Sequence, residues 1–244
     1  MEVVSSKKLS AITAIRFAMS TRVGGVSPEP FDMNMSFSVG DAKEHVTENR
    51  RRFFDVVGIP PERIALPEQC HSATVISVDA GGEYESCDGL VSATPGIWLG
   101  ISVADCVPII LADSRTKAVA ALHAGWRGTR QRIVENGMSL MTGAFGSKPE
   151  HLVAFIGPSA GVCCYQVGAE VAEHFSSPVL THKNGSMYLD LKLENKRQLQ
   201  AAGVPIEQIE TSPHCTICTP DRFHSYRREK ERSGRMMAVV GILL

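Results

Sequence analysis

The chain has 244 residues, of which 21% are charged and 43% hydrophobic, and its formal net charge is -1 at pH 7. No segment approaches the roughly 18 apolar residues of a membrane helix, and the N-terminus lacks the apolar stretch of a signal peptide. We therefore expect a cytoplasmic protein that binds neither nucleic acid nor membrane. The length suits one domain spanning residues 1–244, and no coiled-coil or exposed apolar pattern argues against a monomer.

The first strongly patterned segment predicts a helix between Asp41 and Gly58. Asp41 and Glu44, three residues apart, have the spacing of a capping box. The hydrophobic residues of this segment share one helical face: Val46, Phe53, Phe54 and Val57. Gly58 is then the residue that ends the helix.

The next segments alternate between apolar runs and polar breaks. Residues 73–78 and 97–112 predict strands, and the second run is too long for one strand, so we expect it to break at Ala104-Asp105-Cys106. A buried strand at 118–122 and a helix at 129–141 follow, which leaves His123 between a strand and a helix. Each break exposes polar side chains at the end of an apolar strand.

The second half of the chain repeats this alternation irregularly. Strands are expected near 152–156, 163–167, 187–189, 206–210 and 236–243, and helices near 169–175 and 191–202. Strands outnumber helices and their intervals are uneven, which favours an α+β fold of packed mixed β-sheets flanked by helices. Seven cysteines, an odd number in a chain of this size, indicate reduced thiols in a reducing compartment.

Three residues beside these apolar strands have the chemistry of a metal site: His71, Cys106 and His123. Two imidazoles and one thiolate would hold zinc with one position open for water or substrate. Their spacing matches no short metal motif. The competing interpretation is that the cysteine is an inert buried residue and each histidine a hydrogen-bonded structural one.

Other motifs are weaker or absent. The chain lacks the glycine-rich nucleotide fingerprints, the G-x-S-x-G elbow and the H-E-x-x-H metalloprotease motif. Cys215-Thr216-Ile217-Cys218 resembles half of a zinc ribbon, but without a second C-x-x-C we interpret these cysteines as structural or incidental.

Arg22, in a glycine-rich turn, and Arg127, at a helix start, are candidates for holding phosphate, although glycines often simply make turns. Ser225-Tyr226-Arg227-Arg228 combines aromatic and cationic groups that suit a phosphorylated or aromatic ligand.

In its ordered set of motifs the chain resembles the YfiH-like, laccase-domain family. These proteins were once labelled polyphenol oxidases and are now described as purine nucleoside phosphorylases or peptidoglycan-editing factors. The matching motifs run from about Ser20 to Leu243 and are Ser20-Thr21-Arg22, Gly24-Gly25-Val26-Ser27, Asn34-Met35-Ser36, Gly40-Asp41, Gln69-x-His71, Asp88-Gly89, Ala104-Asp105-Cys106, His123-Ala124-Gly125-Trp126-Arg127-Gly128, Gly157-Pro158, Ser225-Tyr226-Arg227-Arg228 and Gly234-Arg235.

The resemblance implies a YfiH-like α+β fold and a zinc ion held by His71, Cys106 and His123, which are then the catalytic centre. It also implies phosphorolysis of adenosine, inosine, guanosine and methylthioadenosine, together with adenosine deamination. Copper is set aside because a multicopper centre needs many more imidazoles, and no His-x-His pair occurs.

For the substrates, purine nucleosides and phosphate, we expect further binding residues: Arg22, Asn34, Gln69, Asp105 and Arg127. Asp105 is alternatively a partner that orients one of the histidine ligands. Two other functions stay open. Cys106 would serve as the nucleophile of a hydrolase acting on peptidoglycan precursors, or zinc would only stabilise a non-catalytic binding protein.

Overall fold

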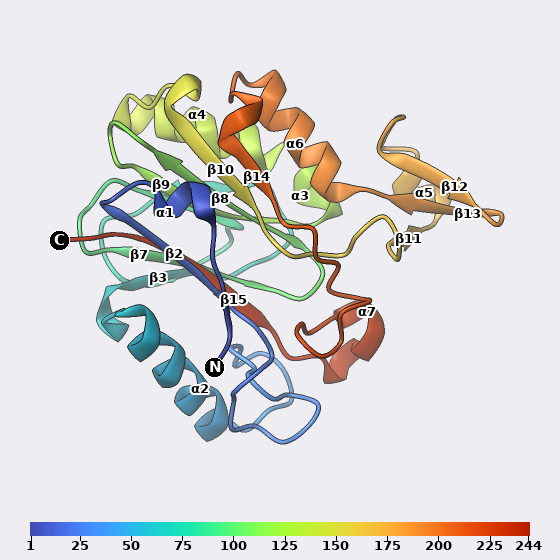
Figure 1. Cartoon of the computed structure of the whole chain (residues 1–244), viewed down its shortest axis with the longest axis horizontal. Coiled ribbons are helices and arrows are strands. Elements are labelled where there is room, and N and C mark those ends of the chain that lie inside the picture. Colours follow the sequence, from blue (N-terminus) through green and yellow to red (C-terminus); the bar gives the residue numbers. More distant parts are fainter.

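The computed structural model describes residues 1–244 and consists of two six-stranded sheets packed face to face, with helices on their outer faces (Figure 1). Both sheets mix parallel and antiparallel pairs. The predicted α+β class, with packed mixed sheets flanked by helices, is therefore confirmed. The single-domain boundary of 1–244 stays a prediction.

The first sheet joins the two ends of the chain. Its strands lie in the order β1 (Val3–Val4), β2 (Ile15–Ser20), β15 (Met236–Ile242), β7 (Trp98–Val103), β3 (Ile64–Pro67) and β5 (Gly82–Tyr84). The last strand of the chain, β15, is thus hydrogen-bonded between β2 and β7. This pairing fixes the segment before β15 beside strands from the first half of the chain.

The second sheet contains most of the strands predicted from the apolar runs. Its order is β14 (Ile209–Thr211), β10 (Leu152–Ile156), β8 (Val107–Asp113), β9 (Val119–Ala124), β6 (Gly89–Ser92) and β4 (Val75–Ser77). The predicted break of the long apolar run is confirmed, since β7 belongs to the first sheet and β8 to the second. The link at 104–106 therefore crosses from one sheet to the other.

Alternating side chains on β8 explain how the layers hold together. Ile110 and Ala112 point into the core between the sheets, whereas Ile109 and Leu111 point into a second core beneath the helices. This is the period of two expected for a strand with both faces buried. The hydrophobic run is continuous because neither face of β8 meets water.

Helices cover the outside of both sheets, except that the first, through Leu9, closes the core between them. They are α1 (Lys7–Ser10), α2 (Lys43–Val57), α3 (Trp126–Arg130), α4 (Ile133–Phe145), α5 (Ala169–Ala172), α6 (Leu191–Ala201) and α7 (Tyr226–Glu229), with short 3-10 turns at Pro61–Arg63, Pro149–His151, Ile206–Gln208 and Lys230–Arg232. The helix α2 packs on the first sheet, and α4 and α6 pack on the second. A small third sheet contains β11 (Gln166–Val167), β13 (Ser186–Leu189) and β12 (Leu180–Lys183).

The predicted capping box of α2 is wrong. The helix starts two residues after Asp41, its N-cap is Ala42, and no side chain caps it. Asp41 instead accepts hydrogen bonds from Ser27 Oγ at 2.7 Å and Asn34 Nδ2 at 3.0 Å. Gly58 ends the helix in the left-handed conformation as predicted, with φ of 82°.

Several other boundaries differ from the sequence expectations. The helix predicted over 129–141 is two helices, because Arg132 has a left-handed φ of 62° between them. The strand expected at 163–167 is reduced to β11, and the one at 206–210 is a 3-10 turn followed by β14. None of the helices combines the length and apolar character needed to cross a membrane.

Candidate metal centre and adjoining pocket

His71, Cys106 and His123 converge at one end of the two sheets. One ligand atom from each lies within 4.8 Å of the others, and the two imidazole rings are 4.9 Å apart, edge to face. Each residue comes from a different element: the loop after β3, the link between β7 and β8, and the end of β9. The predicted proximity of these three residues is thus present in the fold.

Strand register explains the convergence. On β8 and β9, Val107 pairs with Ala124 and Pro108 pairs with His123. Cys106, immediately before Val107, therefore lies opposite Gly125. A Cβ atom added to Gly125 would lie 3.1 Å from Cys106 Sγ and 3.2 Å from His71 Cδ2, so a glycine lets the two side chains approach.

The fully buried carboxylate of Asp88 organises both histidines. It accepts a hydrogen bond from the backbone N–H of His71 at 3.0 Å and contacts His123 Nδ1 at 2.7 Å. It also accepts from Ser72 N at 2.6 Å and Ser72 Oγ at 2.8 Å. Because Asp88 engages Nδ1, His123 has its Nε2 free for a metal ion.

Gln69 supports the same loop rather than the pocket. Its amide exchanges two hydrogen bonds with the backbone of Ser102, at 2.8 Å from Nε2 to the carbonyl and 2.7 Å from the N–H to Oε1. These bonds tie the loop to β7. His71, two residues on, has a left-handed φ of 61°, which the surrounding bonds stabilise.

The site is electrostatically suited to a cation. Burial raises the pKa of Cys106, but the charges and hydrogen bonds of His123 and His71 outweigh burial and lower it to about 6. Burial lowers the pKa of His123, whereas Cys106 and Asp88 raise it to about 9. The Cys106 thiolate therefore lies next to a protonated His123. A metal ion would take the place of the proton on this imidazole.

The donor set fits a metal ion with an open coordination position. One thiolate and two imidazoles supply three ligands, and the group contains no fourth. Such a set suits zinc, and it also occurs in mononuclear copper sites. A multicopper centre has no support here, because only two histidines gather at this place.

Asp105 faces away from the histidines, toward the last part of the chain. Its carboxylate accepts hydrogen bonds from Thr216 Oγ1 at 2.6 Å, Ser225 Oγ at 2.9 Å and Arg227 N at 2.7 Å. No hydrogen bond joins it to His71 or His123. The alternative in which Asp105 orients a histidine ligand is therefore wrong, and Asp88 is the residue that does so.

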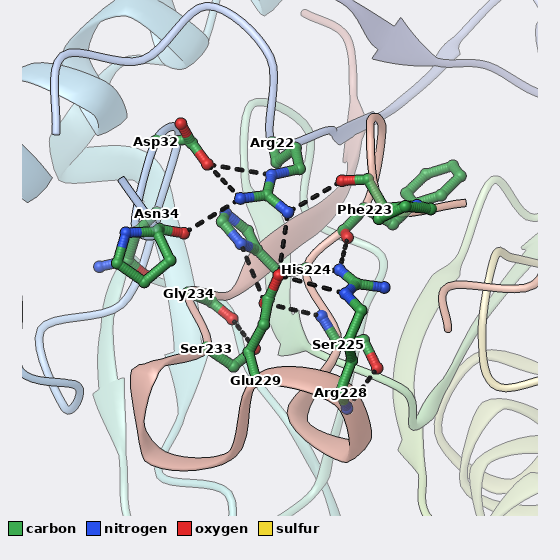
Figure 2. A network of polar contacts seen from close by, with 12 residues as sticks. Arg22, Asp32, Asn34, Phe223, His224, Ser225, Arg228, Glu229, Ser233 and Gly234 are labelled. Atoms are coloured by element: carbon green, nitrogen blue, oxygen red, sulfur yellow. Dashed lines mark hydrogen bonds and ion pairs between the residues drawn. The ribbon is translucent and has the colours of Figure 1, made fainter. Parts of the chain in front are cut away.

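Arg22 and Asn34 belong to a separate polar network (Figure 2). Arg22 forms an ion pair with Asp32 and another with Glu229, and it also donates to the carbonyls of Pro30 and Pro220. All of its N–H donors have protein acceptors.

Asn34 is equally occupied. Its Nδ2 donates to Ser36 O and Asp41 Oδ2, and its Oδ1 accepts from the N–H groups of Ser36 and Arg235. Through these contacts Arg22 and Asn34 stabilise the fold, and their role in substrate binding stays a prediction.

A pocket of about 310 Å³ begins beside the centre. Its lining residues are Trp126, Arg127, Tyr165, Gln166, Val167, Gly168, Glu170, Val171 and Arg227. Trp126 directly follows Gly125, and burial together with the nearby charge of Cys106 raises the pKa of Tyr165 to about 12. The guanidinium of Arg127 stacks on Trp126 at 4.4 Å, and that of Arg227 stacks on Tyr165 at 5.1 Å.

Two residues of the centre and its pocket, Asp88 and Tyr165, could not be predicted from the sequence. The sequence marks Asp88 only within a family motif, because its role depends on the strand pairing that brings it beside His123. Tyr165 was assigned to a strand, whereas it follows a turn closed by its own N–H and the carbonyl of Gly161 at 2.8 Å. Arg227 was singled out with its neighbours, and Arg127 was predicted outright.

Comparison with known proteins yields one family. The family model described as multi-copper polyphenol oxidoreductase laccase matches residues 16–243. A protein of Deinococcus radiodurans named purine nucleoside phosphorylase is 37% identical, covering 94% of this chain and 90% of its own length. The Escherichia coli protein named purine nucleoside phosphorylase YfiH is 36% identical, covering 92% of each. The crystal structure of YlmD from Geobacillus stearothermophilus superposes with a TM-score of 0.92 at 33% identity, covering 98% of this chain and 94% of that one.

Proposed function

The chain belongs to the family described as multi-copper polyphenol oxidoreductase laccase, and we propose that within this family it acts as a purine nucleoside phosphorylase. The observation that carries the proposal is the pocket next to His71, Cys106 and His123, which combines two aromatic rings with two guanidinium groups. The names of the relatives from Deinococcus radiodurans and Escherichia coli support it. We further propose that one domain, residues 1–244, carries the activity.

The pocket has the chemistry that both substrates need. Trp126 is stacked with His174 at 6.0 Å as well as with Arg127, so we propose Tyr165 as the ring on which a purine stacks. Arg127 and Arg227 are exposed and make no hydrogen bond to a carboxylate, so their guanidinium groups are available to phosphate. We assign phosphate binding to these two arginines rather than to Arg22, whose donors are occupied.

The reaction places specific demands on these residues. As phosphate attacks the anomeric carbon and the bond to the purine breaks, positive charge develops on the ribose. The two guanidinium groups hold the phosphate so that its negative charge lies against that carbon. Asp105, by fixing the backbone of Arg227, keeps one guanidinium at the pocket.

We propose zinc as the metal ion, held by His71, Cys106 and His123. When bound, zinc would supply a Lewis acid that polarises an oxygen of substrate or water. Asp88 fixes the ring of His123 for this purpose, and Gly125 leaves the space. Elemental analysis distinguishes zinc from copper, and after oxidation a copper(II) ion at one thiolate and two imidazoles would give an intensely coloured protein, whereas zinc gives a colourless one.

The finer assignments follow from the same proposal. The substrates are adenosine, inosine, guanosine and methylthioadenosine, and adenosine is also deaminated at this site. The monomeric state, the cytoplasmic location and the lack of nucleic acid or membrane partners stay predictions. Size-exclusion chromatography with light scattering tests the first of them.

The deciding experiment is chromatography of reactions with inosine and adenosine, with and without phosphate, using the wild-type chain and Cys106→Ala. We expect free hypoxanthine and adenine only with phosphate, together with ribose 1-phosphate, and no product from the variant. Inosine formed from adenosine without phosphate would report deamination. If no base is released under any condition, the proposal is wrong and the hydrolase acting on peptidoglycan precursors becomes the next hypothesis.

A further inference from the structure

A second group of metal-ligating side chains lies away from the histidine centre. The Sγ atoms of Cys163, Cys164, Cys215 and Cys218 all lie within 4.8 Å of one another. Cys215 is buried, Cys164 is half-buried, and the other two are exposed. The mechanism proposed above uses none of them.

Sheet pairing brings the two cysteine segments together. The strands β10 and β14 are parallel neighbours, so the chain leaves both in the same direction. Beyond the strands, Ser159 still pairs with Cys215, and Thr216 N donates to Ser159 O at 3.0 Å. The adjacent Cys163-Cys164 therefore faces the Cys215-x-x-Cys218 loop.

The spacing of the sulfur atoms suits one metal ion. In a tetrahedral zinc site with Zn–S bonds of about 2.3 Å, neighbouring sulfurs are about 3.8 Å apart. Cys163 Sγ and Cys218 Sγ are 3.9 Å apart, and every other pair lies within 4.8 Å. Rotation of the exposed Cys163 and Cys218 side chains would bring the four sulfur atoms to tetrahedral spacing.

The surroundings favour a thiolate at Cys215. The backbone N–H of Gly161 donates to Cys215 Sγ at 3.2 Å, and a Cβ at Gly161 would lie 3.1 Å from Cys215 Cβ and 3.2 Å from Cys163 Sγ. Lys192 donates to the carbonyls of Ser212 and His214, at 3.0 Å and 3.1 Å, which holds its ammonium next to the cysteine loop. Four thiolates around a divalent ion carry net negative charge, which this lysine partly offsets.

We propose that Cys163, Cys164, Cys215 and Cys218 bind a structural zinc ion, separate from the centre at His71, Cys106 and His123. Four thiolates close the coordination sphere, as in structural zinc sites, and leave no position for substrate. The segment Cys215-Thr216-Ile217-Cys218 resembles half of a zinc ribbon. In this proposal the other two ligands come from an adjacent pair of cysteines, not from a second C-x-x-C.

This site would connect two walls of the pocket. Tyr165 follows Cys164 directly, and Thr216 follows Cys215 and donates to Asp105 at 2.6 Å. Arg228 Nη1 donates to the carbonyls of Thr216 and Ile217 at 2.8 Å and 2.9 Å. Binding one ion at both segments would fix these residues together. The inference does not depend on which reaction the pocket supports.

The test counts zinc ions by native mass spectrometry and elemental analysis on protein purified under reducing conditions with zinc supplied. The wild-type chain is expected to hold two. Cys106→Ala and the double variant Cys215→Ser with Cys218→Ser are each expected to lose one, and the combined variant both. With cobalt, the thiolate charge-transfer absorption should fall far more in the double variant than in Cys106→Ala.

A second measurement keeps the inference testable if the double variant does not fold. The Cys106→Ala chain, which retains only the proposed structural site, should still bind one zinc ion and should melt at a lower temperature when a chelator is added. One zinc ion in the wild type and none in Cys106→Ala would overturn the proposal. So would a wild-type mass lower by two hydrogens and restored by reductant, since that result means a disulfide among these cysteines.

Discussion

Asp88 and His123 form the pair on which the candidate metal centre depends, with 2.7 Å between the carboxylate Oδ1 and the ring Nδ1. The backbone N–H of His123 also donates to the carbonyl of Asp88 at 2.8 Å. The two residues are thus joined through both side chain and backbone. The carboxylate determines which ring nitrogen faces Cys106, although it is not itself among the proposed ligands.

We expect Asp88→Asn to weaken metal binding by roughly 10- to 100-fold, because the amide holds the imidazole less firmly and donates where a carboxylate accepts. Competition with a chromophoric chelator measures the affinity. Asp113→Asn is the matched control, since Asp113 is an equally buried carboxylate that closes a distant turn. Equal metal affinities for the two variants would contradict the role given to Asp88.

Gly125→Ala should reduce metal occupancy while the fold is kept. The added methyl group meets Cys106 Sγ and His71 Cδ2 at distances tighter than ordinary van der Waals contact, and both atoms belong to proposed ligands. Gly143→Ala serves as the control, because a Cβ there meets nothing within 4 Å. In the exposed helix position of Gly143 alanine should stabilise by about 0.5–1 kcal/mol. Full zinc content in Gly125→Ala would refute the steric argument.

Single replacements of Arg127 and Arg227 by alanine should raise the KM for phosphate with little change in thermal stability, because both side chains are exposed at the pocket. Arg130→Ala is a matched control, since Arg130 is an exposed arginine of the same helix as Arg127 and does not line this pocket. A phosphate KM that changes equally in all three variants would indicate a general charge effect instead.

The sequence was sufficient to predict that His71, Cys106 and His123 lie together, because each follows or interrupts an apolar strand, and the structure brings their ligand atoms within 4.8 Å of one another; their role as metal ligands stays a prediction. It could not identify Asp88 as their organiser, since that role arises from the pairing of β6 with β9. Nor does the sequence show that the two cysteine segments meet, because their meeting depends on the parallel pairing of β10 with β14. Non-local strand pairing carries the missing information in both cases.

The error at Asp41 has a related cause. Local spacing correctly marks a helix nearby, but it cannot show that Ser27 and Asn34 occupy the carboxylate. Arg22 illustrates the same limit, since an arginine in a glycine-rich turn suits phosphate until Asp32 and Glu229 are found around it. Tertiary hydrogen bonds decide which polar residues remain available to a ligand.

Arg22→Lys should lower the free energy of unfolding and leave the phosphate KM unchanged. Lysine retains the charge but loses the fork that reaches Asp32 and Glu229 together, and losing hydrogen bonds of a partly buried charged group costs on the order of 2 kcal/mol. Urea unfolding measures the cost, and initial rates at varied phosphate measure the KM. A large rise in KM without loss of stability would restore Arg22 to the phosphate site.

Acid should destabilise the protein partly through Glu229. Burial raises the pKa of this carboxyl, but His224 and Arg228 outweigh burial and lower it to about 2, against an ordinary value of 4.5. A carboxyl whose pKa is lower in the folded state stabilises fully above its unfolded value, and this contribution is lost as the pH falls from there through the folded value.

Glu229→Gln therefore provides a test. The variant should be less stable than the wild type at neutral pH, and the difference should shrink as the pH falls below the unfolded value of 4.5. Urea unfolding of both chains at several pH values measures this convergence. His224 is buried beside Glu229, and burial lowers its pKa whereas Glu229 raises it, so the convergence reports Glu229 and His224 as a coupled pair. A constant difference across the range would mean that Glu229 stays ionised or contributes through packing alone.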